Sequence, residues 1–373
     1  AGGASNTSDG IILMTQQGDV KTPGEAHVVG NRVSGFGGGG IVVQSTLGKL
    51  QVKQNQIDHC GSGVNVVDGT GGLVVSIENN QISDIDVDPK NTGLTTLAGI
   101  GVSGARAVSI AGNSVIRVGL VATSPNLTSS GVRVEGSDGI RIAGNELADI
   151  GPSGLFSGTA AGILALAPIG DVIVDDNRIR RDSARAPADA SIWFGILIFG
   201  TQALLVGGAE TQILGGASKP ASRATATTLP QALQRFAVGN RKTAKAKAGV
   251  APTLTAAAII GTRVSVRGNQ ITARGGTFVV AIVAVPICDF SNNQSLRTAS
   301  ANALGNATIA DIFLTAQTLV VGGNRIVGPK GPSMSLHAPQ GRYTVLGNIT
   351  SGDILVPTTP LAAPWALLNV QSP

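Results

Sequence analysis

Three aspartates alternate with apolar residues in the stretch Asp84-Ile-Asp86-Val-Asp88, and their carboxylates could do chemistry. On an extended strand these three positions share one face, so the carboxylates would point the same way. Oxygen-rich clusters suit Ca²⁺, whose ligands lie within about 2.6 Å of the ion. Same-face neighbours on a strand are roughly 6.6 Å apart, so one ion could be shared only if the chain bends near Pro89 or Gly93. A calcium site and a solvated loop are the two interpretations, and the spacing favours the loop.

Other catalytic chemistries lack their residue sets in this sequence. The chain has three histidines (His27, His59 and His337), no Gly-x-Ser-x-Gly nucleophile elbow and no Cys-x-x-Cys pair for a metal. Cys60 and Cys288 are far apart, so we expect both to pack as small apolar residues. No cofactor is therefore expected, apart from the calcium ion considered above.

The candidate residues lie within a repeat that runs along the chain. An apolar-x-apolar-x-x-Asn frame recurs at intervals of about 24 or about 32 residues, and a period in this range indicates a repeat architecture. Asn31 and Asn240 end looser copies, and Leu204-Val206-Ala209 keeps the frame without its asparagine. The clear copies end at Asn55, Asn80, Asn113, Asn145, Asn177, Asn269, Asn293, Asn324 and Asn348.

A second element precedes each asparagine frame. It is a short β-branched run introduced by glycine, as in Gly99-Ile-Gly-Val102 and Gly131-Val-Arg-Val134. Its period of two is a strand signal, so each repeat is predicted to contain two strands, tight turns and no helix. One such unit cannot bury its apolar face alone, but stacked neighbours can.

These repeats resemble the coils of right-handed parallel β-helices of the pectate-lyase-like superfamily. The resemblance implies an all-β, single-stranded solenoid of about a dozen coils, in which the asparagines form an inward ladder along the axis. Excursions from the repeat occupy residues 84–97, 120–130, 150–160 and 180–190, all after an asparagine frame. We expect them to emerge on one side of the rod and to carry its function.

The same resemblance makes Ile57-Asp58-His59-Cys60 a candidate catalytic stretch. It is similar to the Asp-His-Cys strand of polysaccharide lyases on this fold, which Asp58 and His59 match. The tryptophan that usually precedes that strand is replaced by Gln56-Ile57, and no Arg-x-Pro-x-x-Arg stretch supplies the catalytic arginine. The alternative, which we favour, is an ordinary coil motif that continues into its next turn.

The repeat predicts one domain. Its expected parts are an N-terminal strand or cap over residues 1–27, the β-helix over 28–356 with a loop-rich insertion at 207–258, and a capping tail over 357–373. The insertion contains a basic cluster from Arg235 to Lys247, and because no aromatics are interleaved we favour a solvated loop over a nucleic-acid site. Prolines in the tail cannot continue a strand ladder, so we expect Trp365 to pack on the last coil.

The tail also carries a second resemblance. Its Pro364-Trp-Ala-Leu-Leu-Asn-Val370 sequence resembles the ending of bacterial β-helix proteins encoded with contractile, phage-tail-like injection systems. That resemblance implies other protein subunits as partners. No apolar run reaches the roughly 18–20 residues of a membrane helix. The chain opens without an initiator Met or a signal-peptide core, so we expect a piece of a longer or processed polypeptide, and its localisation stays open.

Two functional hypotheses follow. The first is a non-catalytic structural or recognition rod within a larger bacterial or phage-like surface or injection assembly. The second is a polysaccharide lyase or glycoside hydrolase that acts on an acidic polysaccharide. Aromatic residues make up 3% of the chain, which leaves little for a sugar to stack on and favours the rod.

Overall fold

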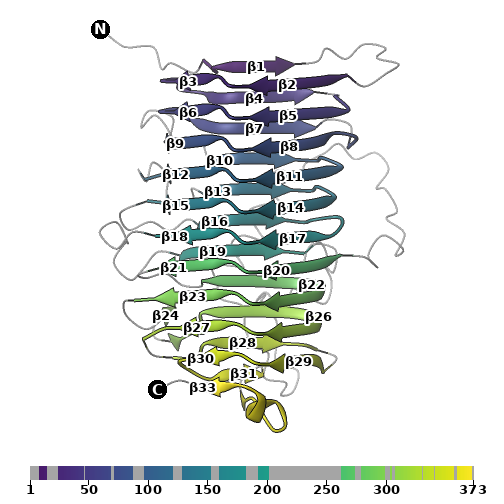
Figure 1. Cartoon of the computed structure of the whole chain (residues 1–373), viewed down its shortest axis with the longest axis vertical. Coiled ribbons are helices and arrows are strands. Elements are labelled where there is room, and N and C mark those ends of the chain that lie inside the picture. Colours follow the sequence, from purple (N-terminus) through teal and green to yellow (C-terminus); the bar gives the residue numbers. More distant parts are fainter. Residues whose placement is uncertain are drawn as a thin grey trace, which may run out of the picture.

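The chain forms a right-handed parallel β-helix, a rod of stacked coils, in the computed structural model (Figure 1). The structure describes residues 8–14, 24–45, 47–68, 71–86, 96–120, 128–152, 159–181, 192–200, 262–273, 279–298, 303–304, 307–329, 331–339, 341–356 and 359–371. Within them, nearly every strand pairs in parallel with the strand one coil away. The predicted fold class is confirmed.

Three ladders of strands run along the rod. The first contains β1 (Ile11–Met14), β4 (Gly39–Ser45), β7 (Ser62–Asp68), β10 (Thr96–Ser103), β13 (Thr128–Glu135), β16 (Thr159–Leu166), β19 (Ile192–Phe199), β22 (Val280–Ser291), β26 (Ile312–Gly322), β28 (Met334–His337) and β31 (Ile354–Val356). The second contains β2 (Glu25–Val29), β5 (Lys49–Lys53), β8 (Val74–Glu78), β11 (Ala107–Ala111), β14 (Gly139–Ala143), β17 (Val172–Asp175), β20 (Arg263–Arg267), the C-terminal halves of β22 and β26, and β29 (Arg342–Leu346). The third contains β3 (Arg32–Ser34), β6 (Gln56–Asp58), β9 (Gln81–Ile85), β12 (Ser114–Val118), β15 (Glu146–Ile150), β18 (Arg178–Arg180), β21 (Gln270–Ala273), β23 (Gln294–Arg297), β27 (Arg325–Val327), β30 (Ile349–Thr350) and β33 (Val370–Gln371).

Each complete coil therefore has three strands, and the prediction of two strands per repeat is wrong. The missed strand is the third one, which begins directly after the ladder asparagine and spans only two to five residues. So short an element shows no clear period of two, although its inward residue is apolar in most coils, as Ile57 and Ile82 show. The coil thus turns at the asparagine rather than ending there.

The asparagine ladder is present as predicted. At a typical rung, the backbone N–H and Nδ2 of Asn113 both donate to Oδ1 of Asn145, at 2.9 and 3.0 Å. The nine predicted asparagines are all at most 1% exposed. Asn31 and Asn369 extend the ladder by one rung at each end, through Oδ1 of Asn55 and Nδ2 of Asn348 respectively.

A left-handed backbone precedes each of the predicted rungs. Glycine fills this position in several coils, such as Gly112 (φ 64°) and Gly144 (φ 62°), because it adopts positive φ without a steric penalty. Other coils place Asn79 or Asp176 there, and short polar side chains tolerate this conformation better than most. The recurring Gly-Asn pair is therefore a turn signal as well as a ladder signal.

The ladder is continuous from Asn177 to Asn269, on either side of the long interruption. Asn177 donates directly to Oδ1 of Asn269, at 3.0 and 2.9 Å, and β17 pairs with β20. The frame at Leu204 and the looser copy at Asn240 lie outside the described residues. The interruption lies between β19 and β20, that is, between a first and a second strand. The predicted excursions instead lie between a third strand and the next first strand.

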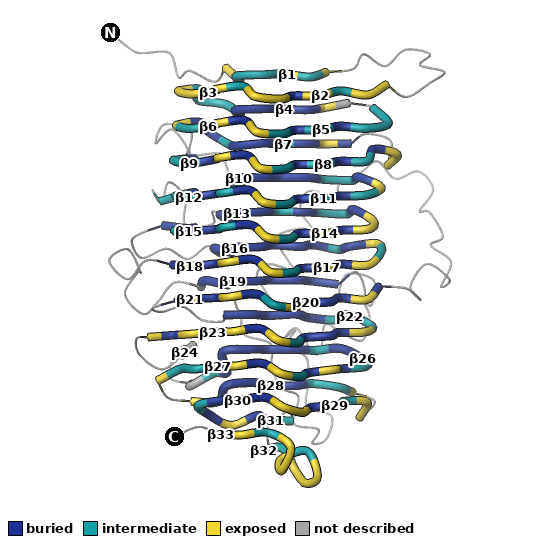
Figure 2. The backbone as a smooth tube through the Cα atoms, viewed as in Figure 1, coloured by how far each residue is buried: buried dark blue, intermediate teal, exposed yellow. Residues whose placement is uncertain are grey.

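Apolar side chains fill the interior of the coils. The buried residues, dark blue in Figure 2, recur along the strands of successive coils. Cys60 and Cys288 are free and buried, as predicted. Trp193 also belongs to this core, whereas its neighbour Phe194 and Phe199 lie on the outer face of β19. There they join a second buried apolar cluster across β16, β19, β22 and β26, made of Ala161, Leu164, Leu166, Phe194, Leu197, Phe199, Ala281, Val283 and Phe313.

A compact cap closes the C-terminal end of the rod. The short β32 (Thr359–Pro360) runs antiparallel to β31, and the 3₁₀ turn η3 (Trp365–Leu368) follows it. The Trp365 ring lies 6.4 Å from the ring of Tyr343 in β29, so the predicted packing of Trp365 on the last coil is confirmed. A separate antiparallel pair, β24 (Ala303–Leu304) and β25 (Ala307–Thr308), stands outside the three ladders.

Candidate functional site

The polar residues of greatest interest lie at the ends of the third strands in successive coils. His59, Asp84, Arg117 and Asp149 all have a left-handed backbone, with φ between 52° and 58°. The pairing of β9 with β12 skips Asp84 and Arg117, so each forms a small bulge at the same place in its coil. Such a conformation costs a non-glycine residue roughly 1–2 kcal/mol, and backbone strain of this kind clusters at functional sites.

These residues, together with Arg181, form a column of ionisable side chains along the rod, which we call the charge column. It consists of His59, Asp84, Arg117, Asp149 and Arg181, each four residues after a ladder asparagine. Every neighbouring pair from His59 to Arg181 interacts electrostatically. The charge column therefore connects five coils.

Asp84 and Arg117 form the strongest contact in the charge column. The Nε and Nη2 of Arg117 donate to Oδ1 and Oδ2 of Asp84, both at 2.5 Å, in the bidentate geometry that suits arginine and carboxylate. The hydrogen bonds from Arg117 hold the pKa of Asp84 below its usual range, against the opposing effect of burial. The same contact raises the pKa of Arg117.

Asp58 and His59 form a second pair at the N-terminal end of the charge column. Oδ2 of Asp58 accepts a hydrogen bond from Oγ of Ser34 at 2.7 Å and lies 2.9 Å from Nδ1 of His59. The Ser34 and His59 contacts lower the pKa of Asp58. The His59 side chain is 69% exposed. An imidazole oriented by a carboxylate is the arrangement of a general base, so this pair is the chemically most capable group in the charge column.

Arg181 ends the charge column in a buried setting. Its guanidinium stacks on Trp193 at 5.7 Å from the ring centroid, and Nη2 donates to the carbonyl of Pro152 at 3.1 Å. Burial lowers the pKa of Arg181 to about 10, so the side chain remains charged at neutral pH. A stacked, buried arginine of this kind holds the end of β18 against the start of β19.

The structure brings three of the five predicted site residues together, namely Asp58, His59 and Asp84. Asp86 follows β9, and its backbone N–H donates to the carbonyl of Cys60. Asp88 lies outside the described residues, as does the basic cluster from Arg235 to Lys247, so the calcium and nucleic-acid interpretations stay untested. Within the described ranges, no group of three or more His, Cys, Asp or Glu side chains is placed to hold a metal.

Arg117, Asp149 and Arg181 were not predicted as site residues from the sequence. The available signal was their spacing, because each follows its ladder asparagine by the same four residues as Asp84 follows Asn80. Arg297 occupies this position after Asn293, and there the side chain is buried with Asp311. Alignment of the repeats on their asparagines would have grouped these charged residues.

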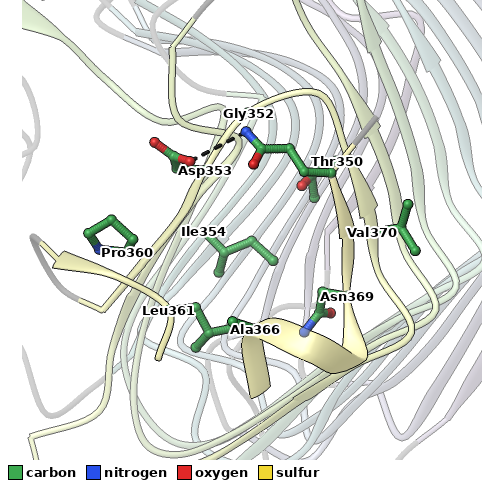
Figure 3. Close-up of a pocket in the computed structure, with 10 residues that line it drawn as sticks. Thr350, Gly352, Asp353, Ile354, Pro360, Leu361, Ala366, Asn369 and Val370 are labelled. Carbon is green, nitrogen blue, oxygen red and sulfur yellow. Dashed lines mark hydrogen bonds between the residues drawn. The ribbon is translucent and has the colours of Figure 1, made fainter. Parts of the chain in front are cut away.

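A small cavity lies apart from the charge column, at the C-terminal cap (Figure 3). Its volume is about 130 Å³, and its apolar lining includes Ile354, Leu361 and Ala366. Nε2 of Gln371 reaches Oδ1 of Asp353 at its edge, at 3.4 Å. This cavity could hold one apolar side chain rather than a sugar or a cofactor.

Comparison with known proteins identified no family model, no curated protein and no solved structure that matches the chain. Among the described residues, no helix is long and apolar enough to cross a membrane. Any function must therefore be inferred from the geometry above.

The ion pair in the charge column predicts a pH-dependent stability. Both side chains are about one-third exposed, so we expect Asp84→Asn to lower the free energy of unfolding by at most about 1 kcal/mol near pH 7. Because the folded-state pKa of Asp84 is lowered, this contribution is present above its ordinary value of 3.8 and is lost as the pH falls through the folded-state pKa. Urea unfolding of both proteins from pH 7 to pH 2 measures the difference. Arg117→Gln should show the same loss, and a difference that persists at the acid end would contradict the assignment.

Proposed function

We propose that the chain is a non-catalytic structural or recognition rod that works within a larger assembly of protein subunits. The observation that supports this function best is the internal pairing of the charge column. Arg117 donates to Asp84 across coils, and Asp149 interacts electrostatically with Arg117 and Arg181, so these groups pair with one another instead of converging on a cavity. Charges arranged in this way tie neighbouring coils together, as the asparagine ladder does inside the rod.

The protonation of the carboxylates also favours a structural role. A general base works best when its pKa lies near the working pH. Contacts lower the pKa of both Asp58 and Asp84, which makes each a weak base at neutral pH. Arg117 is the arginine nearest to them in the charge column, and its Nε and Nη2 already donate hydrogen bonds to Asp84.

The assembly in question is, in this proposal, a bacterial or phage-tail-like surface or injection complex. Its support is the resemblance of the tail sequence from Pro364 to Val370 to the endings of β-helix proteins encoded with such systems. The excursions between third and first strands would then supply contacts to neighbouring subunits, because they leave the rod at one phase of the coil.

A second candidate function, a polysaccharide lyase or hydrolase, is favoured by the pair of Asp58 and His59. The exposed His59 could remove a proton from a sugar ring, and Arg117 lies two coils further along the charge column. A lyase on an acidic polysaccharide needs a base and a group that neutralises the substrate carboxylate. For Arg117 to neutralise the substrate carboxylate, its contacts to Asp84 would have to break.

A reaction panel decides between the two functions. The purified protein is incubated with pectic, alginate, glycosaminoglycan and bacterial capsule polysaccharides, with and without Ca²⁺, and reducing ends and unsaturated products are followed. We expect no product from any polymer. Turnover of any polymer would contradict the rod function if it is abolished by His59→Ala or Asp84→Ala and retained in the control Glu135→Ala. Such a result would support the enzyme function instead. Glu135 suits the control because it forms a comparable ion pair with Arg133 on the first ladder.

A further inference from the structure

The C-terminal end of the rod carries an exposed apolar surface. The exposed fraction is 83% for Leu367 and 60% for Val370. Val370 pairs with Ile349 in the third ladder, and the carbonyl of Leu368 accepts the N–H of Gly347, next to Leu346. We call this surface the tip patch, and its members are Leu346, Ile349, Leu367, Leu368 and Val370.

The tip patch interrupts a column of outward-facing polar residues on the third ladder. One outward column of the third ladder passes through the first residue of each strand, and it is polar in every coil from β3 to β27. It then becomes apolar in the last two strands, at Ile349 and Val370. A change confined to the end of an otherwise polar column marks a surface that is covered by another molecule. The preceding residues of the column are Arg32, Gln56, Gln81, Ser114, Glu146, Arg178, Gln270, Gln294 and Arg325.

The cap limits how another molecule can approach this end. It closes the first ladder with β32, where Pro360 lacks an N–H, and it covers the second ladder with η3. Nδ2 of Asn369 is already bonded to the carbonyls of Val345 and Trp365. At this end of the rod, β33 ends the third ladder with an outer edge that no described strand covers. A second rod therefore cannot continue all three ladders head to tail.

We propose that the tip patch joins two copies of this chain end to end, C-terminus to C-terminus, about a two-fold axis. Such an axis brings the same patch from each copy together, so an apolar surface meets an apolar surface without needing a second complementary site. With the axis perpendicular to β33, the two β33 edges run antiparallel, which lets their main-chain groups bond across the interface. The product is a symmetric double rod whose N-terminal ends point outward.

This inference depends on the proposed function only in that the rod acts through protein contacts. The reaction panel measures catalysis, whereas the test below measures self-association. Failure of the proposed function can therefore be distinguished from failure of this inference.

Sedimentation velocity of the full chain over a wide concentration range tests the proposal. We expect a species of twice the 37.3 kDa chain mass that dissociates on dilution. Leu367→Asp and Val370→Asp place a charge in the apolar interface, and each should weaken the dimer roughly a hundredfold. Both positions are exposed within a single copy, so circular dichroism and the melting temperature measured on the monomer should not change.

Met14→Asp is the matched control, because Met14 is 68% exposed on β1 at the opposite end of the rod. It should leave the dimer intact. A chain that stays monomeric at every concentration overturns the proposal. So does a dimer that survives both tip variants or that Met14→Asp dissociates, since either result places the contact elsewhere.

Discussion

Asn145→Ala is expected to lower the free energy of unfolding by roughly 4 kcal/mol, because it leaves several buried polar groups without partners. The backbone N–H and Nδ2 of Asn113 lose the oxygen that both of them use. The carbonyls of Ile110 and Ala143 lose the Nδ2 donor of Asn145. Urea unfolding followed by circular dichroism measures the change, and the loss should exceed that of any surface substitution tested in parallel.

Asn31→Ala is the control for this result. Asn31 also donates to the next rung, but it lies at the first rung and is only half-buried. Water can replace its lost contacts, so a loss of about 1 kcal/mol or less is expected. Equal losses for Asn31→Ala and Asn145→Ala would mean that burial does not determine the strength of the ladder.

Arg297→Met is expected to destabilise the protein by roughly 3–5 kcal/mol, because it leaves a carboxylate buried without its guanidinium partner. Nε of Arg297 donates to Oδ1 of Asp311 at 2.8 Å, and both side chains are only 2% exposed. The thermal midpoint and urea unfolding curve measure the loss. The double variant Arg297→Met/Asp311→Asn removes both charges and should recover much of it.

Arg133→Met provides the comparison for this buried pair. Arg133 pairs with Glu135 at 2.6 Å, but both side chains are more exposed than those of Arg297 and Asp311. Water compensates for a broken contact at such positions, so the expected loss is within about 1 kcal/mol. If the double variant were as unstable as Arg297→Met alone, the cost would lie in lost packing rather than in the unpaired charge.

The fold could be predicted from the sequence because its strongest constraint is local. A residue that adopts positive φ, an asparagine and an apolar pair before them occur together in each coil, and the ladder needs all of them. Asn369 was not predicted to belong to the ladder because η3 replaces the strand that normally precedes a rung. The third strands were not predicted because a strand of two to five residues is too short to show a clear period of two.

The candidate site was predicted only in part. Asp58, His59 and Asp84 were identified as single residues, but their partners Ser34 and Arg117 lie one coil away, at separations of 24 and 33 residues. Which residues meet across coils depends on the coil length, which varies with each excursion. The burial of Phe194 and Phe199 depends on neighbours that a strand pattern does not specify.

The separation of 92 residues between Asn177 and Asn269 has a consequence for how the rod folds. Elsewhere along the ladder, neighbouring rungs are at most 33 residues apart, so each coil closes a short loop of chain. Loop-closure entropy grows with the logarithm of loop length, which makes this one closure costlier by about 1 kcal/mol. Assembly that advances coil by coil should therefore pause at this step. The coils before β19 can form while the chain is still being synthesised, and those from β20 onward then join them as a second cooperative unit.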